Sequence, residues 1–232
     1  MTFKIKPAFT AKVVPAYFDY QNNFNCEVLP ITSFETRKNF DFSIPKELMI
    51  CVPEGTILTG GFARSIINNE PIKNLDLFFD DSDTFCKLVK RIQNAPVDSF
   101  LHNYTAVKSL NAFNASSDKS IIFTHPTRPP LQLMRDRWYN EIKRKLYNSD
   151  FTVSMFAMDY TMNIHYTSTA LADVTAKVIR VNMINFEQSS SLRAGRLLEQ
   201  KYVFSNSNNM NHSQFNNFIS RHKNNTGYSE IF

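Results

Sequence analysis

Two adjacent glycines, Gly60 and Gly61, place the strongest constraint on how this chain folds. The sequence holds only 5 glycines in 232 residues, so a pair of them indicates a backbone requirement. Glycine adopts positive φ readily and lets the backbone approach a ligand closely. The apolar run 56–58 predicts a short buried strand before the pair, and residues 63–67 predict the start of a helix after it. A strand, a glycine turn and a helix N-terminus in succession can hold a phosphate.

A second predicted strand follows the glycine pair and carries an acidic residue. Residues 74–79 are heavily apolar, which suits a buried strand, and Asp76 lies within them. A carboxylate at this place can hold Mg²⁺ beside a bound phosphate. The alternative is that the Gly-Gly turn is only a tight connection between strand and helix. The hypothesis is therefore a nucleotide site built from the turn and this strand.

Composition sets the broad limits on domain number, partners and compartment. With 232 residues, of which 43% are hydrophobic, the chain fits one large domain or one domain with a small appendage. The net charge of +5 is a mild bias towards anionic partners, although the scattered basic residues also suit an ordinary solvated surface. Cys26, Cys51 and Cys86 have neither the spacing nor the number of a disulfide framework or a zinc site. No secretory signal and no apolar run of about 20 residues is found, so we expect a reducing, cytoplasmic compartment and no membrane partner.

Hydrophobic periodicity and turn residues predict the remaining elements. Strands are expected at 12–14, 26–29, 120–124, 131–134 and 160–166, and helices at 45–51, 84–92, 136–146, 189–204 and 213–222. Residues 171–181 are expected to form a helix or turn followed by a strand. The acidic cluster at 80–83 is interpreted as a helix cap in preference to a metal site, because acidic residues in a first helical turn are stabilising without a ligand.

Three regions follow from this pattern. Residues 1–45, with prolines at four positions, are predicted to be an N-terminal arm or an extra layer on the domain. Residues 46–204 form the predicted central domain. Residues 205–232 are rich in Asn and Ser and are predicted to be a poorly ordered tail.

Five segments, in order along the chain, resemble one protein family. The segments are Gly60-Gly61-Phe62-Ala63-Arg64-Ser65, Asn74-Leu75-Asp76, the run 148–155, the run 172–181 and the run 186–197. Together they are similar to motifs of the DNA polymerase β-like nucleotidyltransferase superfamily. The resemblance is greatest to the head domain of class II CCA-adding enzymes and bacterial poly(A) polymerases, and extends to short stand-alone members encoded by bacteriophages.

The resemblance implies a fold, a reaction and a set of site residues. The implied fold is α+β, a mixed and mostly antiparallel sheet flanked by helices, here with an N-terminal extension. The implied reaction is Mg²⁺-dependent transfer of a nucleotide from an NTP to a hydroxyl acceptor on a nucleic acid or a protein. The implied catalytic and metal-binding residues are Asp76 and Asn74. The implied nucleotide-binding residues are Gly60, Gly61, Arg64, Asp150, Ser154 and Arg193.

Departures from the family pattern open a second hypothesis. Asn74 stands where the family has an acidic metal ligand, and Gln132 is expected near the place of a third carboxylate. Ser65 replaces an acidic residue, and Asn148-Ser149 replace an arginine pair. The alternative function is therefore that of a pseudoenzyme, a structural or binding subunit in a phage virion or replication complex in the host cytoplasm. Its protein contacts are expected through the N-terminal arm and the C-terminal tail.

Overall fold

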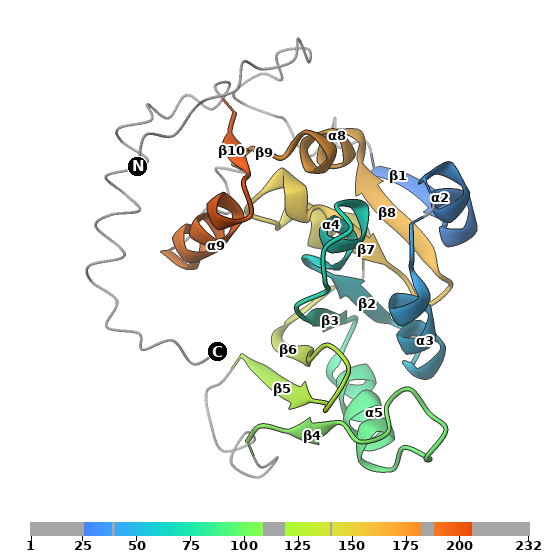
Figure 1. The fold of residues 1–232 in the computed structure, drawn as a ribbon. Coiled ribbons are helices and arrows are strands. Elements are labelled where there is room, and N and C mark those ends of the chain that lie inside the picture. Colours follow the sequence, from blue (N-terminus) through green and yellow to red (C-terminus); the bar gives the residue numbers. More distant parts are fainter. Residues whose placement is uncertain (1–25, 39, 109–118, 140, 182–187, 206–232) are drawn as a thin grey trace.

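A computed structural model of the protein describes residues 26–38, 40–108, 119–139, 141–181 and 188–205 (Figure 1). The strand predicted at 12–14 and the helix predicted at 213–222 lie outside these residues. No helix in the described part of the chain combines the length and the apolar character needed to cross a membrane.

The described strands form one large sheet and one small one. The large sheet has eight strands in the order β1-β8-β7-β2-β3-β6-β5-β4. Their bounds are β1 (Cys26–Pro30), β2 (Thr56–Thr59), β3 (Leu75–Phe79), β4 (Thr105–Ala106), β5 (Ser120–Thr124), β6 (Leu131–Trp138), β7 (Phe156–Met158) and β8 (Asn163–Thr167). Strands β3 and β6 pair in parallel, and the other neighbours in this sheet pair antiparallel. Strands β9 (Val178–Ile179) and β10 (Val203–Phe204) form the small parallel sheet.

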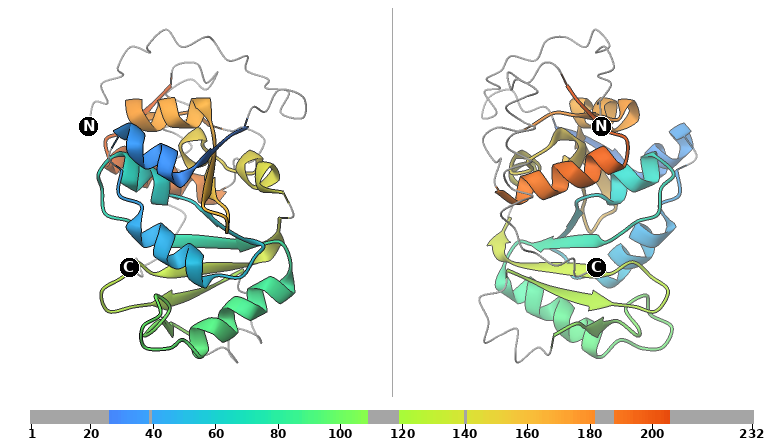
Figure 2. Two further views of the ribbon diagram at one scale, coloured as in Figure 1. Left: turned by 90° about the vertical axis from the view of Figure 1, so that its right-hand side faces the viewer. Right: turned by 60° about the vertical axis from the view of Figure 1, so that its left-hand side comes forward.

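Helices flank the large sheet, so the α+β architecture expected from the sequence is confirmed (Figures 1 and 2). Their bounds are α2 (Ile31–Lys38), α3 (Ser43–Cys51), α4 (Phe62–Ile67), α5 (Ser82–Gln93), α7 (Ile142–Tyr147), η1 (Thr152–Ser154), α8 (Ser168–Ala176) and α9 (Gln188–Glu199). Helix α5 packs Phe85 edge-on against Phe79 of β3, with 5.4 Å between ring centroids. Side chains alternate along a strand. Asp76 and Phe78 therefore share one face of β3, and Phe79 points to the other face, where α5 packs.

The acidic segment before α5 caps the helix, as its sequence predicts. The Asp81 carboxylate accepts a hydrogen bond of 2.7 Å from the backbone N–H of Thr84. The apolar residues that follow at helical spacing, Phe85, Leu88 and Ile92, are all buried. A side-chain cap of this kind stabilises a helix by about 1 kcal/mol.

The N-terminal described residues belong to the large sheet. Strand β1 pairs antiparallel with β8 and forms one end of the sheet. Phe34 of α2 is buried and packs edge-on against Tyr166 of β8, with ring centroids 5.2 Å apart. Residues 26–34 therefore extend the sheet and contribute to its core.

Two helix predictions are wrong in their extent. Residues 136–138 continue β6, and the helix begins only at Ile142. The β3–β6 ladder continues across an irregularity in register to pair Trp138 with Phe79, and the Trp138 ring packs against Phe85 at 6.2 Å. The helix predicted at 189–204 ends at Glu199, because Lys201 adopts a left-handed φ of 66° before β10 begins.

The β7–β8 hairpin contains an ion pair that makes stability depend on pH. His165 Nε2 lies 2.7 Å from Asp159 Oδ2, and both side chains are 15% exposed. Burial lowers the pKa of His165, but hydrogen bonds to Asp159 and Cys26 outweigh it and raise the pKa from 6.5 to about 9. Burial raises the pKa of Asp159, but hydrogen bonds from His165, Thr161 and Asn163 outweigh it and lower the pKa from 3.8 to about 2.

We expect Asp159→Asn to lower the free energy of unfolding by about 2 kcal/mol at pH 6. The contribution of His165 to the free energy of unfolding is complete below pH 6.5 and is lost as the pH rises through about 9. The contribution of Asp159 is present above pH 3.8 and is lost as the pH falls through about 2. Asparagine keeps an oxygen for the backbone N–H groups of the turn. Urea unfolding between pH 5 and pH 10 measures the effect, and a difference between variant and wild type that does not shrink above pH 9 would contradict it.

Candidate functional site

Asp76 lies at the centre of the large sheet, directly beside the strand that leads into the glycine turn. It pairs with Thr59 of β2 on one side and with Gln132 of β6 on the other. Paired residues on neighbouring strands share a face, and the strands lie about 4.8 Å apart. The side chains of Thr59, Asp76 and Gln132 therefore form a row across one face of the sheet.

The Asp76 carboxylate occupies the space beside Gly60 where any other residue would have its Cβ. Gly60 has a φ of +85°, and a Cβ added to it would lie 2.2 Å from Asp76 Oδ2. A Cβ on Gly61 would lie 2.8 Å from an Nη atom of Arg64. Gly60 is therefore required by its backbone conformation and by the short Asp76 side chain beside it, whereas at Gly61 the close atom is the end of the long Arg64 side chain.

Asn74 contacts Asp76 through the nitrogen of its amide. Asn74 Nδ2 donates a hydrogen bond of 2.5 Å to Asp76 Oδ1. An ionised carboxylate only accepts hydrogen bonds, so it orients the NH₂ group of the amide towards itself. On the other side of the row, Gln132 Nε2 donates to the Ser120 hydroxyl at 3.0 Å. Asp76 is thus flanked by two uncharged amides.

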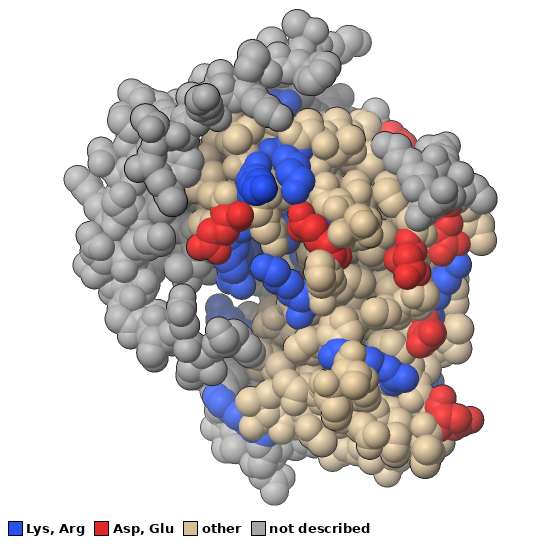
Figure 3. Space-filling model, viewed as in Figure 1, with Lys and Arg blue, Asp and Glu red and all other residues tan. Residues whose placement is uncertain are grey.

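Four cationic side chains from three helices act on the Asp76 carboxylate. Burial raises the pKa of Asp76 to about 6, and nearby positive charges oppose that rise. The positive charges belong to Lys145 of α7, Arg193 and Arg196 of α9, and Arg64 of α4. In the space-filling view, Lys and Arg side chains gather around a hollow in the middle of the face shown (Figure 3).

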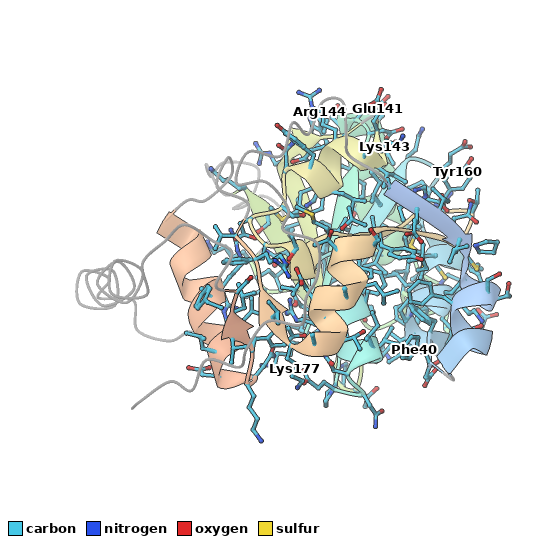
Figure 4. The ribbon with its side chains drawn as sticks, turned by 90° about the horizontal axis from the view of Figure 1, so that it is seen from above. Phe40, Glu141, Lys143, Arg144, Tyr160 and Lys177 are labelled. Carbon is cyan, nitrogen blue, oxygen red and sulfur yellow. The ribbon has the colours of Figure 1, made fainter. Side chains whose placement is uncertain are left out.

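Helix α7 directs one of its three basic residues towards this face of the sheet. Lys145 is half-buried, with its Nζ atom 4.4 Å from the ring centroid of Phe78, two residues after Asp76. Lys143 and Arg144 are exposed and project from the outside of the molecule (Figure 4). Lys145 and Arg196 were not among the site residues expected from the sequence. Lys145 lies in none of the family-like segments, and Arg196 lies in the run 186–197 without being singled out there. The packing of α7 and α9 brings both residues near Asp76.

Asp150 and Arg193 form an ion pair at the edge of the site. Arg193 Nε lies 2.6 Å from Asp150 Oδ2, across 43 positions of sequence. The Asp150 side chain is 8% exposed and that of Arg193 is 49% exposed, so the guanidinium is accessible to a ligand. Ser154, at the end of η1, is half-buried, and its backbone C=O accepts a weak hydrogen bond of 3.4 Å from the Ser149 hydroxyl.

A buried network holds the segment that carries Asp150 and Ser154. Thr152 Oγ1 donates to Asp173 Oδ2 at 2.6 Å, and Arg180 Nε donates to Asp173 Oδ1 at 2.9 Å. The backbone N–H of Thr152 donates to the C=O of Arg180 at 3.1 Å. These contacts join η1, α8 and Arg180, which follows β9, so the position of Asp150 depends on the α8–β9 unit.

The residues around Asp76 do not fit a divalent metal site of the kind that the family resemblance implies. Mg²⁺ at a nucleotide site is usually held by one or two carboxylates, together with water molecules and phosphate oxygens of the substrate. Here one carboxylate is flanked by Asn74 and Gln132, and the Asn74 nitrogen faces it. Among the residues that the structure describes, no group of three or more His, Cys, Asp or Glu side chains is arranged to hold a metal ion.

Known structures with the same fold are nucleotidyltransferases. A CCA-adding enzyme in its apo form I matches with a TM-score of 0.56 and 15% identity, over 85% of this chain and 46% of the enzyme. A CCA-adding enzyme in complex with ATP matches with a TM-score of 0.53 and 17% identity, over 75% of this chain and 42% of the enzyme. The Thermotoga maritima CCA-adding enzyme in complex with tRNA matches with a TM-score of 0.52 and 15% identity, over 84% of this chain and 45% of the enzyme. This chain therefore has a nucleotidyltransferase fold, and it spans less than half the length of these enzymes.

A family model identifies the chain more closely. Residues 32–177, more than half of the chain, match the Gabija anti-defense 2 family. The protein belongs to this family. No curated protein matches the sequence.

Proposed function

We propose that this protein binds a nucleoside triphosphate at the glycine turn and that binding contributes to its anti-defence activity. The observation that carries the proposal is the contact of Asp76 with Gly60 within a group of cations from α4, α7 and α9. Such a group attracts a polyphosphate, which carries several negative charges along a short chain. The family name supplies the biological context, since it assigns these proteins to countering the Gabija defence system.

The phosphates and the nucleoside would occupy different parts of the site. Arg64, Lys145 and Arg196 are the candidate partners of the phosphates, together with the backbone N–H groups of the turn. The Asp150–Arg193 pair and Ser154 are the candidate contacts for the sugar and base. The ATP and CTP complexes of CCA-adding enzymes support a nucleoside triphosphate as the ligand class.

Nucleotidyl transfer to a hydroxyl acceptor is the second candidate function. The observation that favours it is the retained Asp76 carboxylate, which with a pKa of about 6 is largely ionised at neutral pH. The uncharged Asn74 and Gln132 beside it favour binding without transfer. Incubation with labelled ATP or CTP, Mg²⁺ and an RNA, DNA or protein acceptor distinguishes nucleotide binding from nucleotidyl transfer. Transfer of label by the wild type that is lost in Asp76→Asn would establish the enzyme.

We expect isothermal titration to show binding of ATP or CTP, and Arg196→Gln to raise the Kd at least tenfold. Arg196 is exposed on α9, so its replacement removes a charge and leaves the core intact. The matched control is Lys90→Gln on α5, which removes one positive charge on the opposite side of the sheet. The same two variants, expressed in cells that carry Gabija, are expected to differ in protection.

Two results would contradict this proposal. Absence of binding by every nucleoside triphosphate would remove the nucleotide function. An equal effect of Arg196→Gln and Lys90→Gln on the Kd would mean that general charge accounts for binding and that the site lies elsewhere.

A further inference from the structure

We infer that the site binds the polyphosphate without a divalent cation. Cationic side chains of the protein neutralise the phosphate charge, as Mg²⁺ does in a metal-dependent site. This inference rests on the proposed nucleotide function and specifies the form of the ligand. It follows from three features of the described residues: the donor set beside Asp76, the balance of charge, and an unpaired guanidinium nitrogen.

The donor set supplies a single carboxylate, Asp76, and both of its oxygens already have neighbours within the protein. Mg²⁺ between a protein and a triphosphate is usually held by one or two carboxylates. Gln132 is paired with Asp76 on the neighbouring strand, and Asn74, two residues before Asp76, directs its NH₂ group at the carboxylate. The Asn74 hydrogen bond occupies Asp76 Oδ1, and Oδ2 lies against Gly60.

The charge balance favours a ligand with high negative charge. The cations Arg64, Lys145, Arg193 and Arg196 oppose the carboxylates of Asp76 and Asp150. Glu70 also lies near Arg64, and it is paired with Lys177 at 3.0 Å. The site therefore has an excess of positive charge before any ligand binds. A triphosphate bound to Mg²⁺ has lost two of its negative charges and is attracted less strongly.

Arg64 supplies an unpaired donor beside the glycine turn. Its Nε atom is buried and has no hydrogen-bond partner among the described residues. Burial lowers the pKa of the Arg64 guanidinium, although arginine stays charged in proteins. A buried donor on a charged group destabilises the protein when it has no hydrogen-bond partner. A bound phosphate oxygen would satisfy it, and Mg²⁺ would not.

Titration of the full chain with ATP, CTP and inorganic triphosphate, in EDTA and in excess Mg²⁺, tests the inference. We expect the Kd in EDTA to be equal to, or lower than, the Kd in Mg²⁺ for at least one nucleotide. A Kd that rises more than threefold when Mg²⁺ is removed would overturn the inference and leave the proposed function standing. Absence of binding in both buffers would overturn both.

A pair of variants makes the test independent of any single titration. Asn74→Asp combined with Gln132→Asp adds two carboxylates beside Asp76 and leaves the cations in place. We expect this double variant to bind nucleotide at least tenfold more weakly in EDTA and to recover affinity when Mg²⁺ is added. The isosteric exchanges Asn74→Leu and Gln132→Met keep the site uncharged and are expected to keep binding independent of Mg²⁺. Equal Mg²⁺ responses of the acidic and apolar pairs would overturn the inference, and thermal unfolding checks that both pairs fold.

Discussion

Replacing Gly60 with alanine is expected to lower the free energy of unfolding by about 3 kcal/mol and to abolish nucleotide binding. Two costs combine in this variant. A left-handed backbone costs a residue with a Cβ about 1–2 kcal/mol, and at Gly60 φ is +85°. The new methyl group would also lie 2.2 Å from Asp76 Oδ2, so the carboxylate or the turn must move. Overpacking of this kind costs about 1–3 kcal/mol.

Gly195→Ala is the matched control for that variant. Gly195 lies in α9, and a Cβ added there meets no atom within 4 Å. Alanine in a helix interior is favoured over glycine, so we expect this variant to gain about 0.5–1 kcal/mol. Urea unfolding and nucleotide titration of both variants supply the comparison.

A double variant separates the two costs at Gly60. Removing the Asp76 carboxylate in Gly60→Ala/Asp76→Ala relieves the clash and leaves the backbone strain. The double variant is therefore expected to be more stable than Gly60→Ala alone. If it is less stable by the full cost of Asp76→Ala, the contact between Gly60 and Asp76 is not the source of the effect.

Removing the Asp173 carboxylate is expected to have the largest effect on stability away from the glycine turn. Asp173 is 3% exposed and accepts hydrogen bonds from Thr152 and Arg180. Burial raises the pKa of Asp173, and the bonds from Thr152 and the charge of Arg180 oppose the rise. Removing the Asp173 carboxylate leaves the Arg180 guanidinium without this ion pair, and the Arg180 side chain is only 16% exposed. Breaking a buried pair in this way costs about 3–5 kcal/mol, so Asp173→Ala is expected to unfold at much lower urea concentration.

The half-buried pair Lys177–Glu70 provides the comparison for Asp173. Its side chains are 36% and 26% exposed, so solvent screens their attraction. Glu70→Ala is expected to cost about 0–1 kcal/mol. Asp173→Ala should also weaken nucleotide binding, since Thr152 lies between Asp150 and Ser154. A loss below 1 kcal/mol in Asp173→Ala would contradict the importance of the network.

Strands and the glycine turn were predictable because their signals are local. The apolar runs at 56–58 and 74–79 correspond to β2 and β3, and Asp81 is the N-cap of α5. Each of these elements depends on a few consecutive residues. The local pattern of apolar and polar residues indicates which of them are buried and which cap a helix. The structure pairs Gln132 with Asp76 on neighbouring strands.

The extent of β6 was not predictable from local pattern. Its last residues resemble the start of an amphipathic helix, and they form a strand because β3 offers unpaired backbone groups beside them. Lys145 and Arg196 were likewise not expected at the site, although Arg196 lies in one of the family-like segments. Each lies more than 60 positions from Asp76 along the chain, so no local pattern could connect them with it.

The sequence by itself determined that a glycine pair precedes a strand with a single aspartate and with asparagine in place of a second one. These residues are fixed by the covalent structure of the chain, and they determine which chemical groups the site can contain. Only the tertiary structure decided how those groups are used. The fold places the Asp76 carboxylate against Gly60, directs the Asn74 nitrogen at it, and brings cations from α4, α7 and α9 around it. Electrostatic interactions depend on distance in space, and three helices far apart in the chain set that distance here.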